Sequence, residues 1–328
     1  MKIDFHTHII PEQIPNFKQQ FGYGGFITLD KHTNKTNMNL DNGTFFRAIE
    51  CNCYDVPTRL SECDQCNVNV QVISTVPIMF SYWAKPNDTL QVCQFINNHI
   101  AEICKNNPHR FIGLGTLPMN DIKLAIQEAE RCTKELKLKG FQIGTHVNGI
   151  NLDDPQFYPL YEKLEDLKSL IFVHPWDMLG KERMTKYWME WLVGMPCETS
   201  VAMCSILFGG INIKYPNLKF IFSHGGGSFI CTLGRIKHGH EVRPDLFSEK
   251  ISFTDFKNIY VDSLVHDIDI LKKLIKEIGS SNIVLGSDYP FPLGEKYPGS
   301  LIESSDINDN DKEKILWRNA ADLLNLNI

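Results

Sequence analysis

The amino-acid sequence predicts an α/β fold, a (β/α)8 TIM barrel, from two observations. Eight short runs rich in Ile, Val, Leu and Phe recur along the 328 residues, and segments with helical spacing of apolar residues separate them. Near-continuous apolar runs are typical of parallel strands that are buried on both faces. Eight regular strand–helix units favour a closed barrel over a doubly wound open sheet, which is the alternative.

The predicted strands and helices alternate as a barrel requires. Strands are expected at residues 3–8, 70–76, 111–117, 140–147, 170–175, 218–224, 259–263 and 283–288. Helices are expected at residues 89–105, 121–136, from 154 onward, and at 202–213, 267–278 and 309–324. Leu90, Cys93 and Ile100 recur at helical intervals in the first of these helices. Asp121 is a candidate N-cap, and Pro155 suits the first turn of a helix.

Two segments interrupt this rhythm. Residues 11–54 form a polar stretch rich in Gly and Asn after the first strand, and residues 176–196 are rich in Trp, Met and Tyr. A barrel of this kind typically takes ~250 residues, so we expect one domain, residues 1–328, with residues 11–54 as a small insertion or lid. Both segments follow predicted strands and would therefore lie at the mouth of the barrel, where active sites form.

The composition narrows the classes of partner. A formal net charge of −6 and a pI near 6.0 provide no basic surface for nucleic acid. No apolar run approaches the ~20 residues that cross a bilayer, so no membrane partner is expected. Asp4, His6 and His8 stand where a signal peptide would be apolar, which predicts a cytosolic protein. The ten scattered cysteines are then expected to be reduced thiols.

Four of these cysteines are close in sequence. Cys51, Cys53, Cys63 and Cys66 have the ligand types of a four-thiolate zinc site. The alternative, which we favour, places Cys63 and Cys66 on a helix and the other two in a flanking loop.

The predicted strands end in polar side chains that could bind a metal. They are His6 and His8 on the first strand, Gln142, Thr145 and His146 on the fourth, His174 on the fifth, His224 on the sixth and Asp288 on the eighth. Residues i and i+2 of a strand project to one face, so His6 and His8 can bind one ion together. Because the carboxyl ends of barrel strands converge on one mouth, the histidines of strands one, five and six and Asp288 predict a metal centre.

This ligand set points to a particular chemistry. Imidazole and carboxylate groups suit Zn²⁺, with Fe²⁺, Mn²⁺ and Co²⁺ as alternatives. Three histidines and one aspartate would leave a position for water, whose pKa falls to about 7 on a metal ion. The remaining histidine would transfer protons. His224 is the favoured candidate because it precedes a Gly-rich turn where backbone can approach a substrate, and His146 is the alternative.

Six longer motifs narrow the class of enzyme. They are STVPIMFSYWAKP (74–86), GLGTLPM (113–119), QIGTHVN (142–148), HPWDM (174–178), WLVGMP (191–196) and DYPFPLGE (288–295). Together with the His-x-His pair at the N-terminus, they resemble the decarboxylases of the amidohydrolase superfamily, whose barrels are of the metal-dependent hydrolase type. The resemblance runs from Met1 to the last predicted helix.

The resemblance implies roles for the residues of the metal centre. One Zn²⁺ per subunit would be held by His6, His8, His174 and Asp288, with His224 as the catalytic base. Many superfamily members carry a carboxylated lysine on the fourth strand. This chain has Gln142 or its neighbours at that position, which implies a mononuclear site.

The resemblance also implies substrate contacts. Arg47 would bind a substrate carboxylate, and Arg235 would reach into the neighbouring subunit's site in a homodimer. The pocket would be lined by Met178, Trp191 and Phe291, with Trp188 as an alternative to Trp191.

The implied reaction is the non-oxidative decarboxylation of a small dicarboxylate that carries a conjugated enamine and an aldehyde. Guanidinium groups bind carboxylates bidentately, which lysine does not. The alternatives are a hydrolase of the same superfamily acting on an amide or lactone, a decarboxylase for an aromatic acid, and a barrel that serves only as a binding scaffold. The two arginines argue against a neutral substrate, and the full set of imidazoles argues against a scaffold.

Overall fold

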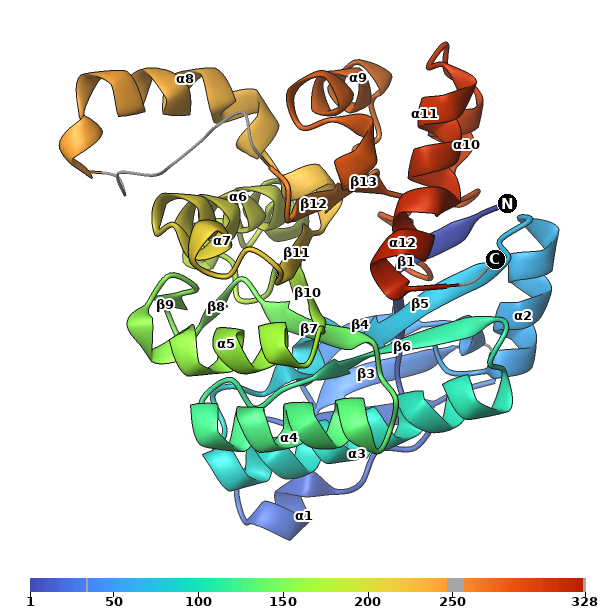
Figure 1. Cartoon of the computed structure of the whole chain (residues 1–328). Helices are drawn as coiled ribbons and strands as arrows, with labels where there is room; N and C mark the ends of the chain where they lie inside the picture. Colours follow the sequence, from blue (N-terminus) through green and yellow to red (C-terminus); the bar gives the residue numbers. More distant parts are fainter. Residues whose placement is uncertain (34, 247–255, 327–328) are drawn as a thin grey trace.

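The computed structural model describes residues 1–33, 35–246 and 256–326, and its centre is one sheet of eight parallel strands (Figure 1). The strands are β1 (Ile3–Ile9), β5 (Val70–Thr75), β6 (Phe111–Thr116), β7 (Gly140–Gly144), β10 (Leu170–His174), β11 (Lys219–Phe222), β12 (Ile259–Asp262) and β13 (Ile283–Val284). Each is hydrogen-bonded to the next along the chain. All eight lie within the apolar runs described above or within one residue of them, and the α/β barrel prediction is confirmed.

Hydrogen bonds between the first strand and the segment after β13 close the barrel. The backbone N–H of Phe5 donates to the carbonyl of Leu285 at 2.8 Å, and that of Asp288 donates to His6 at 2.9 Å. Closure leaves the eight-stranded sheet without a free edge. It also places His6 and His8 of β1 beside the segment that carries Asp288.

Apolar side chains fill the amino-terminal half of the barrel. The inner cluster includes Ile3, Phe5, Val72, Leu114, Phe172 and Ile221, all buried. The ring of Phe5 meets the ring of Phe172 edge-on, with centroids 5.9 Å apart. Ala320 and Leu324 of α12 (Asn319–Leu324) pack against the same cluster. This apolar plug leaves only the carboxyl ends of the strands for polar groups.

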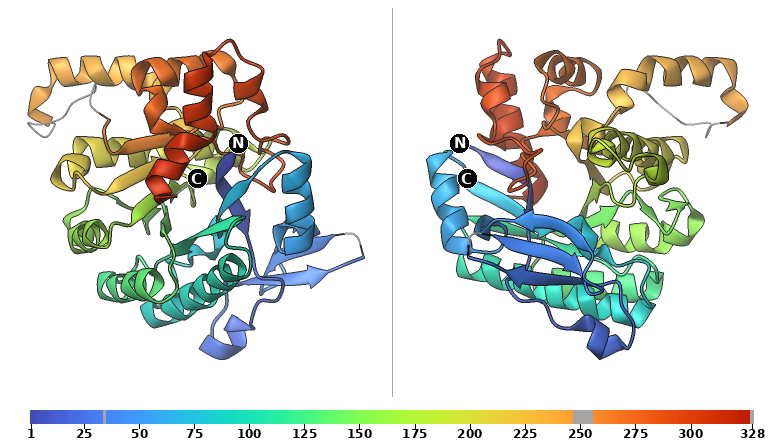
Figure 2. Two further views of the ribbon diagram at one scale, coloured as in Figure 1. Left: turned by 45° about the vertical axis from the view of Figure 1, so that its right-hand side comes forward. Right: turned by 180° about the vertical axis from the view of Figure 1, so that it is seen from behind.

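Helices surround the strands in Figure 2. The helices α3 (Pro86–Asn106), α4 (Ile122–Lys134), α5 (Tyr158–Asp166) and α9 (Ile268–Glu277) follow the predictions within a few residues. The side chain of Asp121 caps α4 by accepting hydrogen bonds from the N–H groups of Lys123 and Leu124. The last predicted helix is present as α11 (Asp309–Glu313), a π turn (Lys314–Arg318) and α12.

Two helices differ from the predictions. Helix α6 (Met195–Phe208) begins and ends earlier than residues 202–213, because Pro196 suits its first turn and Gly210, at φ 67°, separates it from α7 (Ile211–Lys214). Helix α8 (Phe229–Val242) follows β11 and is missing from the predicted set. Gly234 and Gly239 lower its intrinsic helix propensity.

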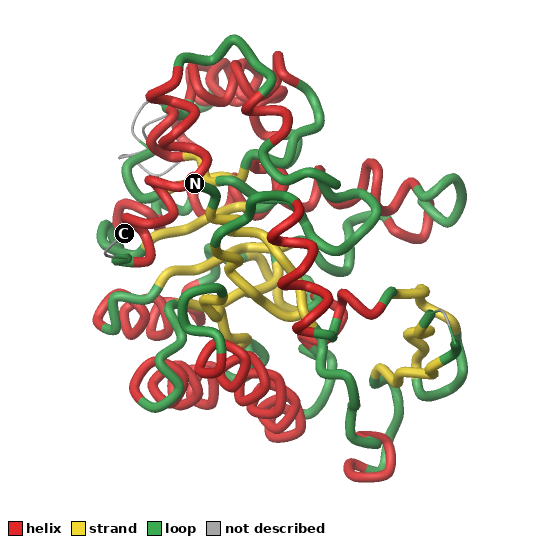
Figure 3. The backbone as a smooth tube through the Cα atoms, turned by 90° about the vertical axis from the view of Figure 1, so that its right-hand side faces the viewer, coloured by secondary structure: helices red, strands yellow, loops and turns green. Residues whose placement is uncertain are grey.

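The predicted insertion folds into a small substructure, described apart from residue 34. It contains α1 (Phe17–Phe21) and an antiparallel sheet of β2 (Ile27–Lys31), β3 (Thr36–Leu40) and β4 (Phe45–Ile49). Figure 3 shows this sheet at the side of the molecule, apart from the barrel strands. Helix α2 (Val56–Gln65) then leads back to the barrel. A lid function for the insertion stays a prediction.

One stretch is more apolar than the sequence analysis anticipates. Residues Glu190–Phe208, a π turn followed by α6, are long and apolar enough to cross a membrane by length and composition alone. In the structure, 44% of the most apolar window is buried. Leu192 and Val193 at its start remain exposed beside the mouth of the barrel.

Candidate metal centre and substrate pocket

An irregularity in β1 aims both of its histidines at the barrel interior. The pairing of β1 with β5 shifts register between Asp4 and Thr7, as in a β-bulge. Phe5 and His6 are consecutive, yet both rings contact Phe172 inside the barrel, with centroids 5.9 and 4.9 Å away. Bulges of this kind redirect side chains near active sites. The shift lets the apolar plug and the His-x-His pair occupy the same strand.

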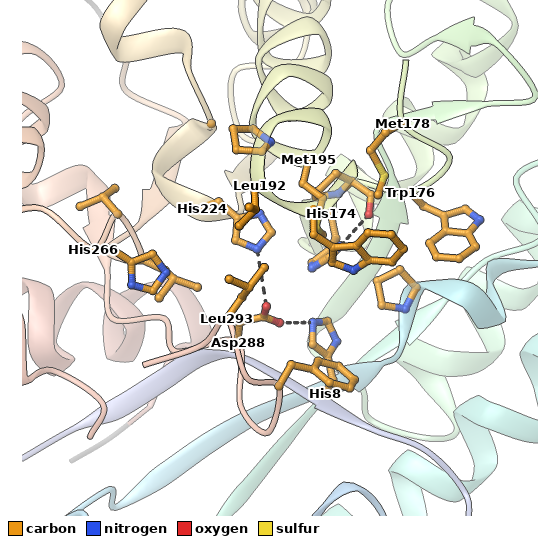
Figure 4. Close-up of a pocket in the computed structure, with 18 of the residues that line it drawn as sticks. His8, His174, Trp176, Met178, Leu192, Met195, His224, His266, Asp288 and Leu293 are labelled. Carbon is orange, nitrogen blue, oxygen red and sulfur yellow. Dashed lines mark hydrogen bonds and ion pairs between the residues drawn. The ribbon is translucent and has the colours of Figure 1, made fainter. Parts of the chain in front are cut away.

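The five residues predicted to form the metal centre converge at the mouth, and Figure 4 shows four of them, His8, His174, His224 and Asp288. One donor atom each from His6, His174, His224 and Asp288 lies within 4.8 Å of the others. His8 Nε2 lies 3.1 Å from His6 Nε2 and 3.0 Å from Asp288 Oδ1. Among the described residues, this is the one cluster of His, Cys, Asp and Glu donors with metal-site geometry. The structure describes Cys51, Cys53, Cys63 and Cys66, and these four thiols do not form a metal site among the described residues.

The outward ring nitrogens reveal which atoms face the centre. Nδ1 of His6 contacts Asp262 Oδ2 at 2.7 Å, Nδ1 of His8 contacts the carbonyl of Thr75 at 2.9 Å, and Nδ1 of His174 contacts the carbonyl of Pro175 at 3.0 Å. These acceptors require a proton on Nδ1, so in neutral rings each Nε2 presents a lone pair inward.

A divalent cation fits between these atoms. The Nε2 atoms of His6 and His8 lie 3.1 Å apart, so a proton or a metal ion must lie between their lone pairs, and the buried Nε2 of His174 has no hydrogen-bond partner. A cation would satisfy all of these atoms at once. Three imidazole nitrogens and a carboxylate oxygen are the donors that Zn²⁺ and related divalent metals prefer.

Burial and charge set the protonation of these groups. Burial lowers the pKa of His8, and lowers that of His174 well below its usual range. Burial alone would raise the pKa of Asp288, but its close contacts with His224 and the β1 histidines hold it well below the ordinary value. Burial would likewise lower the pKa of His6, yet Asp262 and Asp288 together raise it to about 10. Without a metal, His6 is therefore a cation, with its second proton on Nε2.

Metal binding is expected to displace that proton. Because the pKa of His6 is about 10 in the metal-free site, proton and metal compete for its Nε2 at every lower pH. The apparent metal affinity should rise about tenfold per pH unit between pH 7 and 9. Chelator competition at pH 7, 8 and 9 measures this slope. An affinity that does not change with pH would contradict the proposed competition at His6.

Asp262 supports the candidate metal centre, and the sequence alone does not single it out. It ends β12, is fully buried, and accepts four hydrogen bonds. Its carboxylate holds His6 Nδ1 at 2.7 Å and the backbone N–H groups of His224 and Gly225 at 2.9 and 2.8 Å. The fourth comes from Leu264 N–H at 3.1 Å. One carboxylate thus fixes both a candidate metal ligand and the turn that carries the candidate base.

A buried arginine supports the ligands from the side of α2. Arg59 is fully buried and donates through Nη2 to the carbonyl of His8 and through Nη1 to Gln71 at 2.9 Å. Its guanidinium lies 4.7 Å from the ring centroid of Tyr289, the residue after Asp288. Arg59 therefore links the two chain segments that close the barrel at the metal centre.

His224 occupies the turn after β11. Its Nε2 lies 3.8 Å from Asp288 Oδ2, and its Nδ1 lies 3.2 Å from Ser223 Oγ. Both His224 and Asp288 have left-handed backbones, with φ of 54° and 56°, a conformation that is common at functional sites when the surroundings enforce it. Gly227 completes the turn, because a Cβ there would approach the carbonyl of Pro196 to 2.1 Å.

The metal centre forms the floor of a pocket of about 330 Å³. Its walls are mostly apolar and include Phe46, Trp176, Met178, Trp191, Leu192 and Phe291. Arg47 also lines the pocket, with its guanidinium 4.4 Å from the ring centroid of Phe291. Burial lowers the pKa of Arg47 and the charge of Asp288 opposes this, so Arg47 remains a cation. Such a pocket suits a flat, unsaturated anion.

The remaining predicted residues lie elsewhere. Trp188 and Arg235 are exposed and are not among the residues that line the pocket. His146, the alternative base, is also outside this lining, and its ring contacts the carbonyl of Asp177 and the N–H of Gly149. Gln142 is buried on β7, and no described residue pairs with its amide.

Comparisons with known proteins identify the family of this chain. The amidohydrolase family model matches residues 3–326. The chain is 51% identical to the 2-amino-3-carboxymuconate-6-semialdehyde decarboxylase of Dictyostelium discoideum, covering 99% of this chain and 92% of that protein. It is 41% identical to the Caenorhabditis elegans protein of the same name, covering 99% and 94%.

A solved structure shows the same fold. The dihydroxybenzoic acid decarboxylase of Polaromonas, with bound manganese, superposes with a TM-score of 0.79 at 23% identity, covering all of this chain and 97% of that one. The predicted class of enzyme is confirmed. The chain belongs to the amidohydrolase family and is a decarboxylase.

Proposed function

We propose that this enzyme converts 2-amino-3-carboxymuconate 6-semialdehyde to 2-aminomuconate 6-semialdehyde and CO₂, using one Zn²⁺ per subunit. The relatives named for this substrate match nearly the whole chain. The observation that carries the proposal is the placement of Arg47 in one pocket with the metal ligands. In tryptophan (kynurenine) catabolism, this reaction would limit the formation of quinolinate.

The chain's own groups suit each step of this reaction. A divalent metal at the centre would supply activated water at neutral pH. Arg47 holds a substrate carboxylate, and the aromatic walls keep the conjugated chain flat above the ligands. His224 takes a proton from the attacking water as its oxygen bonds to one carbon of the conjugated double bond.

His224 then returns a proton to the neighbouring carbon, which becomes tetrahedral. The bond from that carbon to its carboxylate breaks and CO₂ leaves. The electron pair re-forms the double bond and expels the added hydroxyl as hydroxide, which takes a proton from solvent to become water, so that the overall reaction consumes one proton.

The test combines metal analysis with a CO₂ assay. Purified enzyme of known metal content should consume the substrate's absorbance and release one CO₂ per molecule. A dihydroxybenzoate is the second substrate to assay, since a fold relative is named for that class. Turnover of the aromatic acid alone would refute the proposed substrate. Comparing the activities of separately prepared zinc-loaded and manganese-loaded enzyme shows which metal supports the reaction.

We also propose that the enzyme acts as a homodimer in which Arg235 completes the site of the partner. Arg235 lies on the exposed surface of α8, outside its own pocket. Exposed apolar side chains are present at the end of α8 and on the turns before α6 and after α8: Val242, Leu192, Val193 and Leu246. A second copy would bury this surface.

Mixing two inactive variants tests the shared site. Arg235→Ala and His224→Ala should each be inactive alone. After subunits exchange, half of random dimers carry one intact site, so activity should return to about a quarter of the wild-type value. No recovery in mixtures that demonstrably exchange subunits would contradict the cross-subunit role.

A further inference from the structure

A histidine without a role in this reaction lines the pocket. His266 lies between β12 and α9 and is exposed at the pocket wall. In Figure 4 its ring stands on the far side of His224 and Asp288 from Trp176 and Met178. Within the described parts of the chain, neither ring nitrogen forms a hydrogen bond or ion pair. Its N–H is therefore available to a ligand.

The turn around His266 is held on both sides. Before it, the N–H of Leu264 donates to Asp262 Oδ1 at 3.1 Å. After it, Asp267 caps α9 by accepting hydrogen bonds from Asp269 and Ile270 N–H at 2.8 and 3.0 Å. His266 itself has a φ of 57°, a left-handed conformation that persists in non-glycine residues only when neighbours enforce it. The imidazole is thus presented from a fixed backbone.

The permanent positive charge of the pocket is on the opposite wall. Arg47 supplies the one Arg or Lys side chain in the lining that the structure describes. Its neighbour Phe46 packs against Trp176 and Trp191, with ring centroids 6.0 and 6.4 Å apart. The wall that carries Arg47 therefore includes Trp176, across the metal centre from His266.

We propose that the imidazole N–H of His266 donates a hydrogen bond to the aldehyde oxygen of the substrate. The inference rests on the proposed function. In that substrate, both carboxylates are on adjacent carbons, and the aldehyde ends the conjugated chain three carbons further on. With a carboxylate at Arg47 and the reacting carbons above the ligands, the aldehyde extends toward His266.

This contact would also favour the reaction. Addition of water to the double bond pushes electron density along the conjugated chain to the aldehyde oxygen. A hydrogen bond at that oxygen strengthens as the negative charge develops, so it stabilises the transition state more than the bound substrate. His266 would thus both orient the substrate and determine specificity for an acceptor at that end.

Two substitutions change the side chain of His266 without straining its left-handed backbone. Glycine adopts the left-handed conformation without strain, and asparagine tolerates it while keeping an N–H donor. His266→Gly is expected to lower kcat/KM for the semialdehyde about tenfold, and His266→Asn should lower it less. Added imidazole should restore part of the activity of His266→Gly alone. The control is His109→Asn, an exposed histidine at the other end of the barrel.

Phthalate distinguishes the aldehyde contact from a general effect on the pocket. It has two adjacent carboxylates and no remote acceptor, so its inhibition constant should be the same in His266→Gly and wild type. The inference would be overturned if the phthalate inhibition constant of His266→Gly rose as much as its KM for the semialdehyde. It would also be overturned if His266→Gly had the same kcat/KM as the wild type. If the wild-type enzyme itself fails to turn over the semialdehyde, the proposed function fails instead.

Discussion

His224→Ala is expected to lower kcat by about 10³-fold while the metal stays bound. The imidazole faces Asp288 across the pocket floor, with Nε2 3.8 Å from Oδ2. Removing it takes away the group that moves the proton. The four proposed ligands, His6, His8, His174 and Asp288, remain and are expected to hold a divalent ion.

Measuring the metal content of His224→Ala together with its kcat distinguishes a base from a metal ligand. His224 lies within the cluster of donor atoms, so loss of metal together with activity would make it a ligand and refute its role as base. His146→Ala is the matched control, because His146 is the other strand-end histidine considered for this role and lies outside the pocket lining. That variant should keep the wild-type kcat.

Asp262→Asn is expected to weaken metal binding by 10- to 100-fold and to lower kcat as well. Asparagine has nearly the same shape, but its amide cannot accept all four hydrogen bonds. If the amide donates to His6 Nδ1, the ring proton moves to Nε2, where it blocks the metal. If the amide turns around, it loses an N–H partner in the turn that carries His224.

Chelator competition gives the metal affinity, and saturating metal then reveals the remaining effect on kcat. Asp269→Asn, an exposed carboxylate on α9, is the control and should match wild type in both. A thermal melt shows whether the Asp262 variant is folded. Wild-type metal affinity in folded Asp262→Asn would show that this carboxylate does not position His6.

The strands and the cluster of candidate metal ligands could be predicted from the sequence because the barrel imposes a simple pattern on both. Parallel strands are buried on two faces, so they appear as apolar runs, and their carboxyl ends share one mouth. His174 and Asp288 each follow such a run, and the structure places their side chains together. This pattern can be recognised in the sequence without knowing which side chains are in contact.

The supporting residues depend on contacts that no periodicity encodes. Asp262 and Arg59 are single charges among many, and their importance comes from full burial beside His6 and His8. The insertion strands β2 to β4 contain Asn, Lys and Thr with weak alternation, so the sequence reads as a loop. The choice between Trp191 and Trp188 likewise required the turn before α6, which places Trp191 in the pocket lining.

The most direct test of the account is to remove the metal and return it in measured amounts. Enzyme stripped by a chelator should release no CO₂ from the semialdehyde, and activity should rise linearly until one divalent ion per subunit has been added. Asp288→Ala should show neither tight binding nor recovery. CO₂ release by the stripped enzyme at the full rate, or full metal occupancy in Asp288→Ala, would contradict a decarboxylase built on this metal centre.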